Sequence, residues 1–300
     1  MNWKKTGLYA GITLAMCFWA FSFIWYKQAF LQLTPIPLVF IRLLVASAFL
    51  GLIIVISGKW EKIKRKDLKL FALMSFFEPF LYFICESYGM TMVSSTTGSV
   101  IIAFIPLLTP FAALVLLKEK INWFNITGII IGFAGVILVI TDRSFRLDAP
   151  APGIILMFMA VMSVVSYSGI IVYLAKNYRP LTIIFMQNII GSLMFIPLFM
   201  IVGIREMADI SLSWEVLYPV IKLGIFPSAL AFILFTRAIR DIGIVRANIF
   251  TNFIPVFTAI LSFIILKEEM PAGKIAGIFI VLAGLVISQR KKPLSEKPEH

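Results

Sequence analysis

The chain has 300 residues, of which 60% are hydrophobic and only 14% are charged, and its mean hydropathy is +0.98. Water-soluble domains are about half apolar and about one quarter charged, so this composition excludes a soluble globular protein. The formal net charge of +12 does not indicate a nucleic-acid partner, because basic residues in a membrane chain mark cytoplasmic loops. We therefore expect an all-α integral membrane protein in a lipid bilayer.

Ten apolar segments follow one another along the chain, and each is long enough for a helix to cross a hydrocarbon core of ~30 Å. They cover residues 7–26, 36–57, 69–90, 95–117, 122–141, 152–175, 181–203, 215–238, 243–266 and 273–289. The alternating pattern of outer-membrane barrel strands does not occur in them. The sequence thus predicts ten transmembrane helices.

The positions of Lys and Arg predict how these helices are oriented. Most of the 27 basic residues fall in segments that share one side of the membrane with the N-terminus, including the 59–69 loop. Since cytoplasmic loops are enriched in Lys and Arg, we expect a plasma (inner) membrane protein. Its N-terminus, residues 1–6, and its C-terminal tail, residues 290–300, are then both cytoplasmic.

Two segments of the chain repeat one pattern. FIPLLTPFAALVLLKEK begins at Phe104 and FIPVFTAILSFIILKEE begins at Phe253, and their prolines differ by 149 residues (255 − 106). The same offset relates Gly128 to Gly277 and Gly135 to Gly284. Shared Pro, Lys-Glu and Gly positions in one register indicate a duplicated unit.

The duplication divides the spans into two halves of five, residues 7–141 and 152–289, joined by an external linker, 142–151. Because five is odd, the second half enters the membrane from the opposite side. Inverted repeats of this kind are typical of secondary transporters, whose halves rock about a site near the midplane.

The repeated region also resembles a known family. The segment SSTTGSVIIAFIPLLTPFAALVLLKEKINWFNITGIIIGFAGVILVI is similar to the EamA-type domain of the drug/metabolite transporter superfamily, and IVRANIFTNFIPVFTAILSFIILKEEMPAGKIAGIFIVLAGLVIS is similar to the same domain. Shared features are small polar residues, a proline, a Glu-ended helix and a Gly-x₆-Gly helix. The resemblance implies a cavity lined mainly by spans 1, 3, 4, 6, 8 and 9, and transport of a small metabolite.

Two glutamates of the third span, Glu78 and Glu86, are the strongest site candidates, because ionisable residues at membrane depth are costly and usually face a cavity or a partner. On an ideal helix they lie within about 80° of each other, with Tyr82 between them. Each is expected either to couple transport to protons or substrate, or to form an ion pair with Arg42 or Lys222. A place near the outer interface is a further alternative for Glu86.

Arg42, in PLVFIRLLVA of the second span, matches an arginine of the family pattern. Its alternatives are contact with the substrate, or pairing with an acid and snorkelling toward the interface.

Several other side chains within the spans are candidates for a pocket. Asn248 and Asn252 lie four residues apart on one face of the ninth span, and each offers a donor and an acceptor either to a ligand or to a neighbouring helix. Gln187 follows the same logic. Trp19 and Tyr167 suit stacking or cation–π contact with a solute, or else packing in the core.

Pro106 and Pro255 fall about halfway along spans 4 and 9. Each removes an amide donor and is expected to kink its helix, so that carbonyls line the cavity. The glutamates that end these spans, Glu119 and Glu268, are expected to meet partner backbone or charge at the interface, with a gating role as the alternative.

Together these features predict a secondary transporter for a small organic metabolite, such as an amino acid, a nucleobase or an amphipathic drug-like solute. Alternating access, export and coupling to protons are the leading expectations, and a passive facilitator or channel is the alternative. An intramembrane enzyme is disfavoured because the one histidine, His300, is the last residue. We expect no catalytic residue, no metal and no cofactor, and either a monomer or a homodimer.

Overall fold

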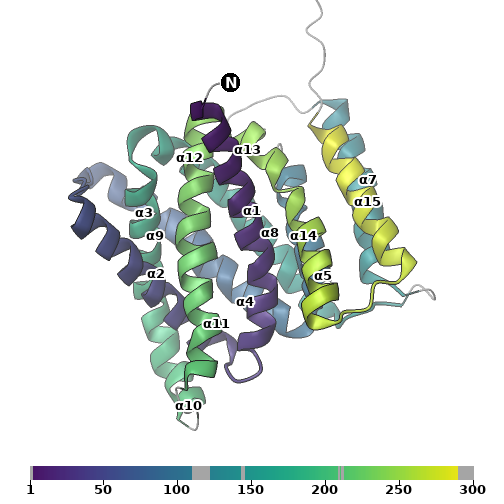
Figure 1. Cartoon of the computed structure of the whole chain (residues 1–300), viewed down its shortest axis with the longest axis horizontal. Coiled ribbons are helices and arrows are strands. Elements are labelled where there is room, and N and C mark those ends of the chain that lie inside the picture. The colour runs from purple at the N-terminus through teal and green to yellow at the C-terminus, as the bar shows by residue number, and fades with distance from the viewer. Residues whose placement is uncertain (1–2, 110–121, 143–145, 209, 211–212, 290–300) are drawn as a thin grey trace, which may run out of the picture.

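The computed structural model describes residues 3–109, 122–142, 146–208, 210 and 213–289. Figure 1 shows these residues as a bundle of long helices, with the N-terminus and the end of the last helix at the same end of the bundle. The first half contains α1 (Trp3–Ala29), α2 (Pro35–Ser57), η1 (Arg65–Asp67), α3 (Leu68–Ser75), η2 (Phe76–Leu81), α4 (Tyr82–Met92), α5 (Ser95–Ile102) and α7 (Trp123–Ile140).

The second half repeats the order of the spans, although its described helices are divided into more segments. They are α8 (Ala151–Asn177), α9 (Pro180–Leu198), η3 (Phe199–Gly203), α10 (Ile204–Met207), α11 (Trp214–Ile225), η4 (Phe226–Ala231), α12 (Phe232–Ile242), α13 (Ile244–Phe250), α14 (Phe253–Leu261), η5 (Ser262–Leu266) and α15 (Ala272–Ser288).

The prediction of an all-α chain with ten membrane spans is confirmed. Within the described residues, eight helical stretches are long and apolar enough to cross a membrane, and two shorter apolar helices cover Ser95–Thr109 and Ala272–Ser288. Nine of these stretches coincide with predicted segments to within four residues, and Ser95–Thr109 covers the described part of the predicted segment 95–117. Glu119 and the tail from residue 290 lie outside the described residues.

Turn residues in the sequence explain where the helices begin and end. Extended backbone at Thr34 precedes α2, whose first turn holds prolines that need no amide partner. The same helix stops at Gly58, which adopts φ 60° and so supplies the left-handed conformation of a helix C-terminus.

The inverted relation of the two halves is visible where α7 packs against its copy, α15, at one edge of the bundle (Figure 1). A Cβ atom placed on Gly128 would lie 2.5 Å from the carbonyl oxygen of Gly284, and one on Gly135 would lie 2.7 Å from that of Gly277. Residue numbers thus rise along one helix as they fall along its neighbour. Because α15 is the copy of α7, their antiparallel contact shows that the halves have opposite directions in the bundle.

The other contacts between the halves follow the same pseudo-twofold relation. Helix α2 packs against its copy α9, and α5 packs against α14. The contact of α4 with α8 is matched by that of α11 and α12 with α1. Each half therefore contributes one wall to the space between them.

Four spans are interrupted near their midpoints, and these interruptions surround that space. Span 3 contains the π-helical turn η2 around Pro79, and span 8 contains η4 around Pro227. Span 4 has a turn at residues 103–104, just before Pro106, and span 9 has one at residues 251–252, before Pro255. A turn thus precedes each of these two prolines, and the predicted kinks at Pro106 and Pro255, with carbonyls that line the cavity, stay predictions.

Candidate functional site

A cavity of about 100 Å³ lies between the two halves. Spans 1, 3, 4, 6, 8 and 9 line it, as the family resemblance implied, and span 2 adds Arg42. The lining residues are Trp19, Ser22, Phe23, Arg42, Glu78, Tyr82, Phe83, Glu86, Ile102, Ala103, Ile105, Pro106, Val164, Tyr167, Ser168, Ile171, Phe232, Phe235, Ile239, Ile244, Asn248, Thr251 and Ile254. Most of this surface is apolar or aromatic, and the few charged groups on it are Arg42, Glu78 and Glu86.

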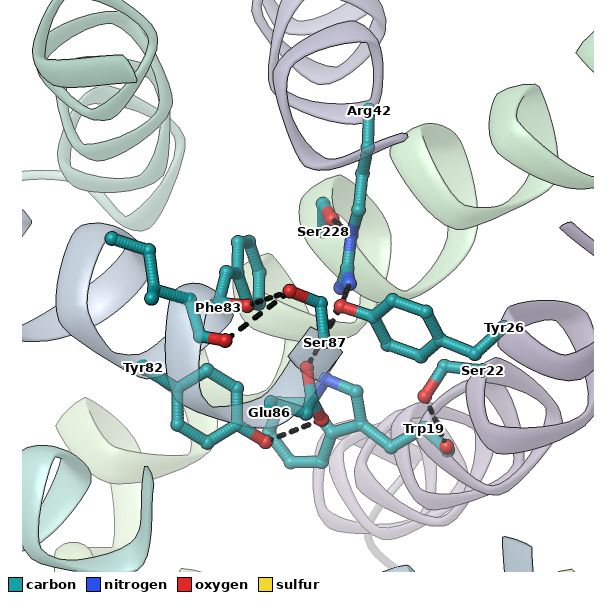
Figure 2. A network of polar contacts seen from close by, with 10 residues as sticks. Trp19, Ser22, Tyr26, Arg42, Tyr82, Phe83, Glu86, Ser87 and Ser228 are labelled. Atoms are coloured by element: carbon teal, nitrogen blue, oxygen red, sulfur yellow. Dashed lines mark hydrogen bonds and ion pairs between the residues drawn. The ribbon is translucent and has the colours of Figure 1, made fainter. Parts of the chain in front are cut away.

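Arg42 is the centre of a polar network on one wall of the cavity, drawn in Figure 2. Its Nε donates to the hydroxyl of Ser228 from the second half, and its Nη1 donates to the Tyr26 hydroxyl, each at 2.5 Å. The guanidinium also lies 4.0 Å from the centre of the Phe83 ring, within the range of a cation–π contact. The buried cation is thereby fixed between the two halves.

Glu86 completes this network. Its carboxylate accepts hydrogen bonds from the hydroxyls of Tyr26 at 2.9 Å and Tyr82 at 2.7 Å, and one of its oxygens is 3.9 Å from Nη1 of Arg42. Figure 2 shows the carboxylate between the two tyrosine side chains. Glu86 is 3% exposed, so its charge is compensated inside the protein and not by water.

Glu78, on the same span and the same cavity, has a different environment. Only 1% of this residue is exposed, and neither carboxyl oxygen has a hydrogen-bond partner among the described residues. Its backbone, at φ −136° and ψ 112°, is extended and lies inside the interruption that precedes Pro79. Beside this break, the carbonyl of Phe77 accepts from the Ser163 hydroxyl of α8 at 2.6 Å and from the backbone amide of Tyr82. The break is thus supported from the second half, while the carboxyl itself is left without a donor.

Aromatic rings make up another part of the lining. The indole of Trp19 meets Phe232 and Phe235 with its ring centroid 5.2 and 5.0 Å from theirs, both in edge-to-face geometry. Tyr167 lines the cavity from α8, and its hydroxyl donates to Oε1 of Gln187 over 3.5 Å, a long hydrogen bond.

Most of the side chains singled out from the sequence meet around this one cavity. Those that line it are Trp19, Arg42, Glu78, Tyr82, Glu86, Pro106, Tyr167 and Asn248. Three do not line it. Gln187 accepts a hydrogen bond from Tyr167, and Pro255 is buried in α14. Asn252 lies in the turn after α13, with its Oδ1 buried and unpaired within the described residues. Their function in binding, like that of the eight lining residues, stays a prediction.

The structure also decides between alternatives that the sequence left open. The partner of Arg42 is Glu86, while Lys222 lies over the rings of Trp25 and Tyr218. Snorkelling of Arg42 was a wrong alternative, because the residue is 2% exposed and points into the bundle. The alternative of a place near the outer interface for Glu86 stays a prediction.

The site residues predicted from the sequence did not include three members of the network: Tyr26, Phe83 and Ser228. Tyr26 follows Trp19 and Phe23 at helical spacing, and this periodicity was the signal that it faces the same side. Phe83 had no distinguishing signal among 28 phenylalanines, and Ser228 depends on how two helices cross.

A second polar contact joins the halves at one end of the bundle. Lys267 ends span 9 in the left-handed conformation, with φ 56°, and turns the chain so that Glu268 faces α5. The Glu268 carboxylate accepts from the backbone amide of Ser95 at 2.8 Å, and from the amide and hydroxyl of Thr96 at 3.2 and 2.8 Å. We call these bonds the Glu268 clasp. They confirm that Glu268 meets partner backbone, and a carboxylate is favoured at this helix N-terminus.

Comparison with known proteins gives one consistent result. The EamA-like transporter family matches residues 6–141 and again 151–289. An uncharacterized transporter of Archaeoglobus fulgidus is 29% identical over 94% of this chain and 98% of its own length. The uncharacterized transporter YetK of Bacillus subtilis is 27% identical over 96% and 88%.

More distant relatives agree. A probable terminal-alkyne amino-acid exporter of Streptantibioticus cattleyicolor is 21% identical over 89% of this chain and 85% of its own. A solved crystal structure superposes with a TM-score of 0.71 at 14% identity, covering 94% of this chain and 98% of that one, which shows the same fold. With two family matches across almost its whole length, the chain is a membrane transporter and not an enzyme, and it belongs to the EamA-like transporter family.

Proposed function

We propose that the protein is a proton-coupled secondary transporter that exports a small organic solute, with Glu78 as the group that exchanges a proton. The observation that carries the proposal is the contrast between two carboxyls on one span. Glu86 is held by Arg42 and two tyrosine hydroxyls, whereas Glu78 has no donor among the described residues. A buried carboxylate without a donor is costly, so Glu78 needs a proton or a positively charged ligand.

Alternating access in this proposal is a motion of residues 7–141 against residues 152–289, with 142–151 as the linker. The Glu268 clasp joins the halves at the end of the bundle opposite the N-terminus, where α14 turns toward α15 (Figure 1). The cavity, in contrast, reaches Ile239 and Ile244 at the junction of α12 and α13, near the N-terminal end. The clasp then acts as the outer gate, and its bonds break when the outward-facing state forms.

The orientation of the chain and the plasma membrane as its location are proposed from the distribution of basic residues. Most basic residues lie in segments on the side of the N-terminus, so we place both termini in the cytoplasm and the protein in the plasma membrane. Export is supported by the relative that is named as a probable exporter. Since one chain supplies all the described lining residues, a monomer is sufficient for the transport cycle.

The test begins with a screen of metabolites for thermal stabilisation of the purified protein, because a ligand that binds the native state raises its stability. The best solute is then loaded into proteoliposomes, and its flux is measured with and without an imposed pH gradient. The proposal predicts flux against the concentration gradient of the solute when the pH gradient is present.

A passive facilitator is the second candidate. It would equilibrate the same solute at the same rate with or without the pH gradient, and it would never accumulate it. That result would replace proton-coupled transport by facilitation.

A further inference from the structure

The charged groups on the cavity lining do not cancel. Within the described residues, the lining carries two carboxyls, Glu78 and Glu86, and one basic group, Arg42. Arg42 is already engaged by Glu86 and donates to two hydroxyls. A solute that enters therefore meets one unmatched acid, Glu78, and a guanidinium whose Nε and Nη1 are occupied.

The uncharged part of the lining, like the unmatched carboxyl of Glu78, favours a positively charged solute. Trp19, Phe232 and Phe235 form a group of contacting rings, and Phe23 and Tyr167 add further aromatic surface. The faces of aromatic rings carry negative partial charge and attract ammonium groups within about 6 Å, with tryptophan the strongest. Rings also hold the apolar body of such a molecule.

We propose that the transported solutes are small organic cations, with an ammonium group that lies against Glu78 and an apolar body among these rings. The inference rests on the proposed function, because it names the substrate class of the same cavity. The cavity of about 100 Å³ is smaller than the cavity of about 150 Å³ that accommodates one benzene molecule, so its lining has to widen when a solute of the size of choline binds.

Other charge types fit the lining less well. An anion would add a second uncompensated negative charge beside Glu78. A zwitterion such as an amino acid would bring a carboxylate that must compete with Glu86 for Arg42. With a neutral solute, Glu78 would have to stay protonated throughout the cycle. The solute would then not be exchanged for a proton at this carboxyl.

Proton and cation compete for one carboxyl in this scheme, so binding of a permanently charged cation strengthens as the pH rises. The titratable groups around Glu78 are Tyr26 of α1, Glu86 and Tyr82 of α4, Tyr167 of α8, and Arg42 of α2. Helix α9, which also packs on η2, carries no titratable side chain, and Lys69 of α3 is exposed. Since Arg42 and two hydroxyls already hold Glu86, we assign the pH dependence to Glu78.

Three molecules of nearly equal shape test the inference. Choline carries a permanent positive charge, 3,3-dimethylbutan-1-ol is its neutral carbon isostere, and betaine is a zwitterion with the same trimethylammonium group. Binding of each to the full-length protein in lipid nanodiscs is measured by calorimetry between about pH 5 and pH 8. We expect choline to bind at least about tenfold more tightly than the isostere, and the difference to grow with pH.

Variants assign the effect to one carboxyl. Glu78→Gln is expected to remove the preference for choline and its pH dependence, while affinity for the neutral isostere is retained and reports an intact cavity. Glu269→Gln, at an exposed acid outside the cavity lining, is the matched control and is expected to bind as the wild type does.

Equal binding of choline and the isostere, tighter binding of betaine, or no binding of choline would overturn the cation inference. Choline binding that is unchanged in Glu78→Gln would overturn the assignment to Glu78. The proposed function is judged separately: if another solute from the thermal screen is driven by a pH gradient, proton-coupled transport stands even though the cation class is wrong.

Discussion

Nη1 of Arg42 and Oε2 of Glu86 lie 3.9 Å apart on different helices, and the hydroxyl of Tyr26 is hydrogen-bonded to both side chains. This arrangement neutralises one of the two acids in the cavity and leaves Glu78 as the other. The two carboxyls therefore differ in environment although they occupy the same span.

The first prediction concerns the stability of the two glutamine variants. Glu86→Gln removes the charge that compensates Arg42, and should lower the free energy of unfolding by about 1–3 kcal/mol. Glu78→Gln removes a carboxyl that has no donor among the described residues, and should leave stability unchanged or slightly raised at neutral pH. Thermal unfolding of both variants in one detergent shows which of them is less stable. A lower melting temperature for Glu78→Gln than for Glu86→Gln would contradict the assignment of the ion pair.

A second prediction uses the geometry of the guanidinium. Arg42→Lys keeps the charge but cannot reach Ser228 and Tyr26 together or lie flat on Phe83, so it should cost about 1–2 kcal/mol. The control is Arg237→Lys, since the Arg237 side chain is 60% exposed. If both variants melt at the same temperature, the network adds no stability beyond the charge of Arg42.

The third prediction concerns the contact between α7 and α15. Gly128→Ala places a methyl group 2.5 Å from the carbonyl oxygen of Gly284, so the helices must separate, at a cost of about 1–3 kcal/mol. In Gly273→Ala, on α15, the nearest atom to the new methyl group is 3.9 Å away. That variant should be neutral or more stable by up to about 1 kcal/mol, because Ala is the better helix former. Equal effects of the two variants would contradict the close packing of the duplicated helices.

The contact between α7 and α15 also illustrates what the sequence could predict. The ten spans and their inverted duplication depend on local hydropathy and on residues that recur at one offset, Gly128 with Gly277 and Gly135 with Gly284. Both properties are carried by the chain itself, and the structure agrees with them. That the two helices contact each other could not be deduced, since it depends on how the halves are placed.

Most of the residues selected from the sequence line the cavity, but the contacts that they make with one another were not predicted. Buried acids and aromatic residues are conspicuous in an apolar chain, so Glu78, Glu86 and Trp19 could be selected. On an uninterrupted ideal helix, however, Glu78 and Glu86 would have equivalent positions. The interruption at residues 76–81 makes their environments differ, and the sequence pattern did not predict it. Which acid receives Arg42 is decided by helix crossings that bring in distant side chains such as Ser228, and periodicity contains no information about them.

The fourth prediction tests the Glu268 clasp as an outer gate. Glu268→Gln keeps the shape of the side chain but weakens its bonds to Ser95 and Thr96, and should favour the outward-facing state. The readout is the rate at which a membrane-impermeant maleimide, added outside, labels Ser22→Cys in a background in which Cys17 and Cys85 are Ala. We expect labelling to be several-fold faster than in the parent background.

The control for this measurement is the adjacent exposed acid. Glu269→Gln should leave the labelling rate unchanged, because only the charge at Glu268 contacts α5 among the bonds that the structure describes at this end. Equal rates in the parent and in both variants would mean that the clasp only stabilises the fold.

The most direct test of the central claim is proton release when the solute binds. The solute that stabilises the protein most in the thermal screen is added to protein in weakly buffered solution, and the released protons are counted for wild type, Glu78→Gln and Glu269→Gln. The account predicts about one proton per bound solute from the wild type and from Glu269→Gln, and none from Glu78→Gln. Binding without proton release by the wild type, or equal release from Glu78→Gln, would contradict it.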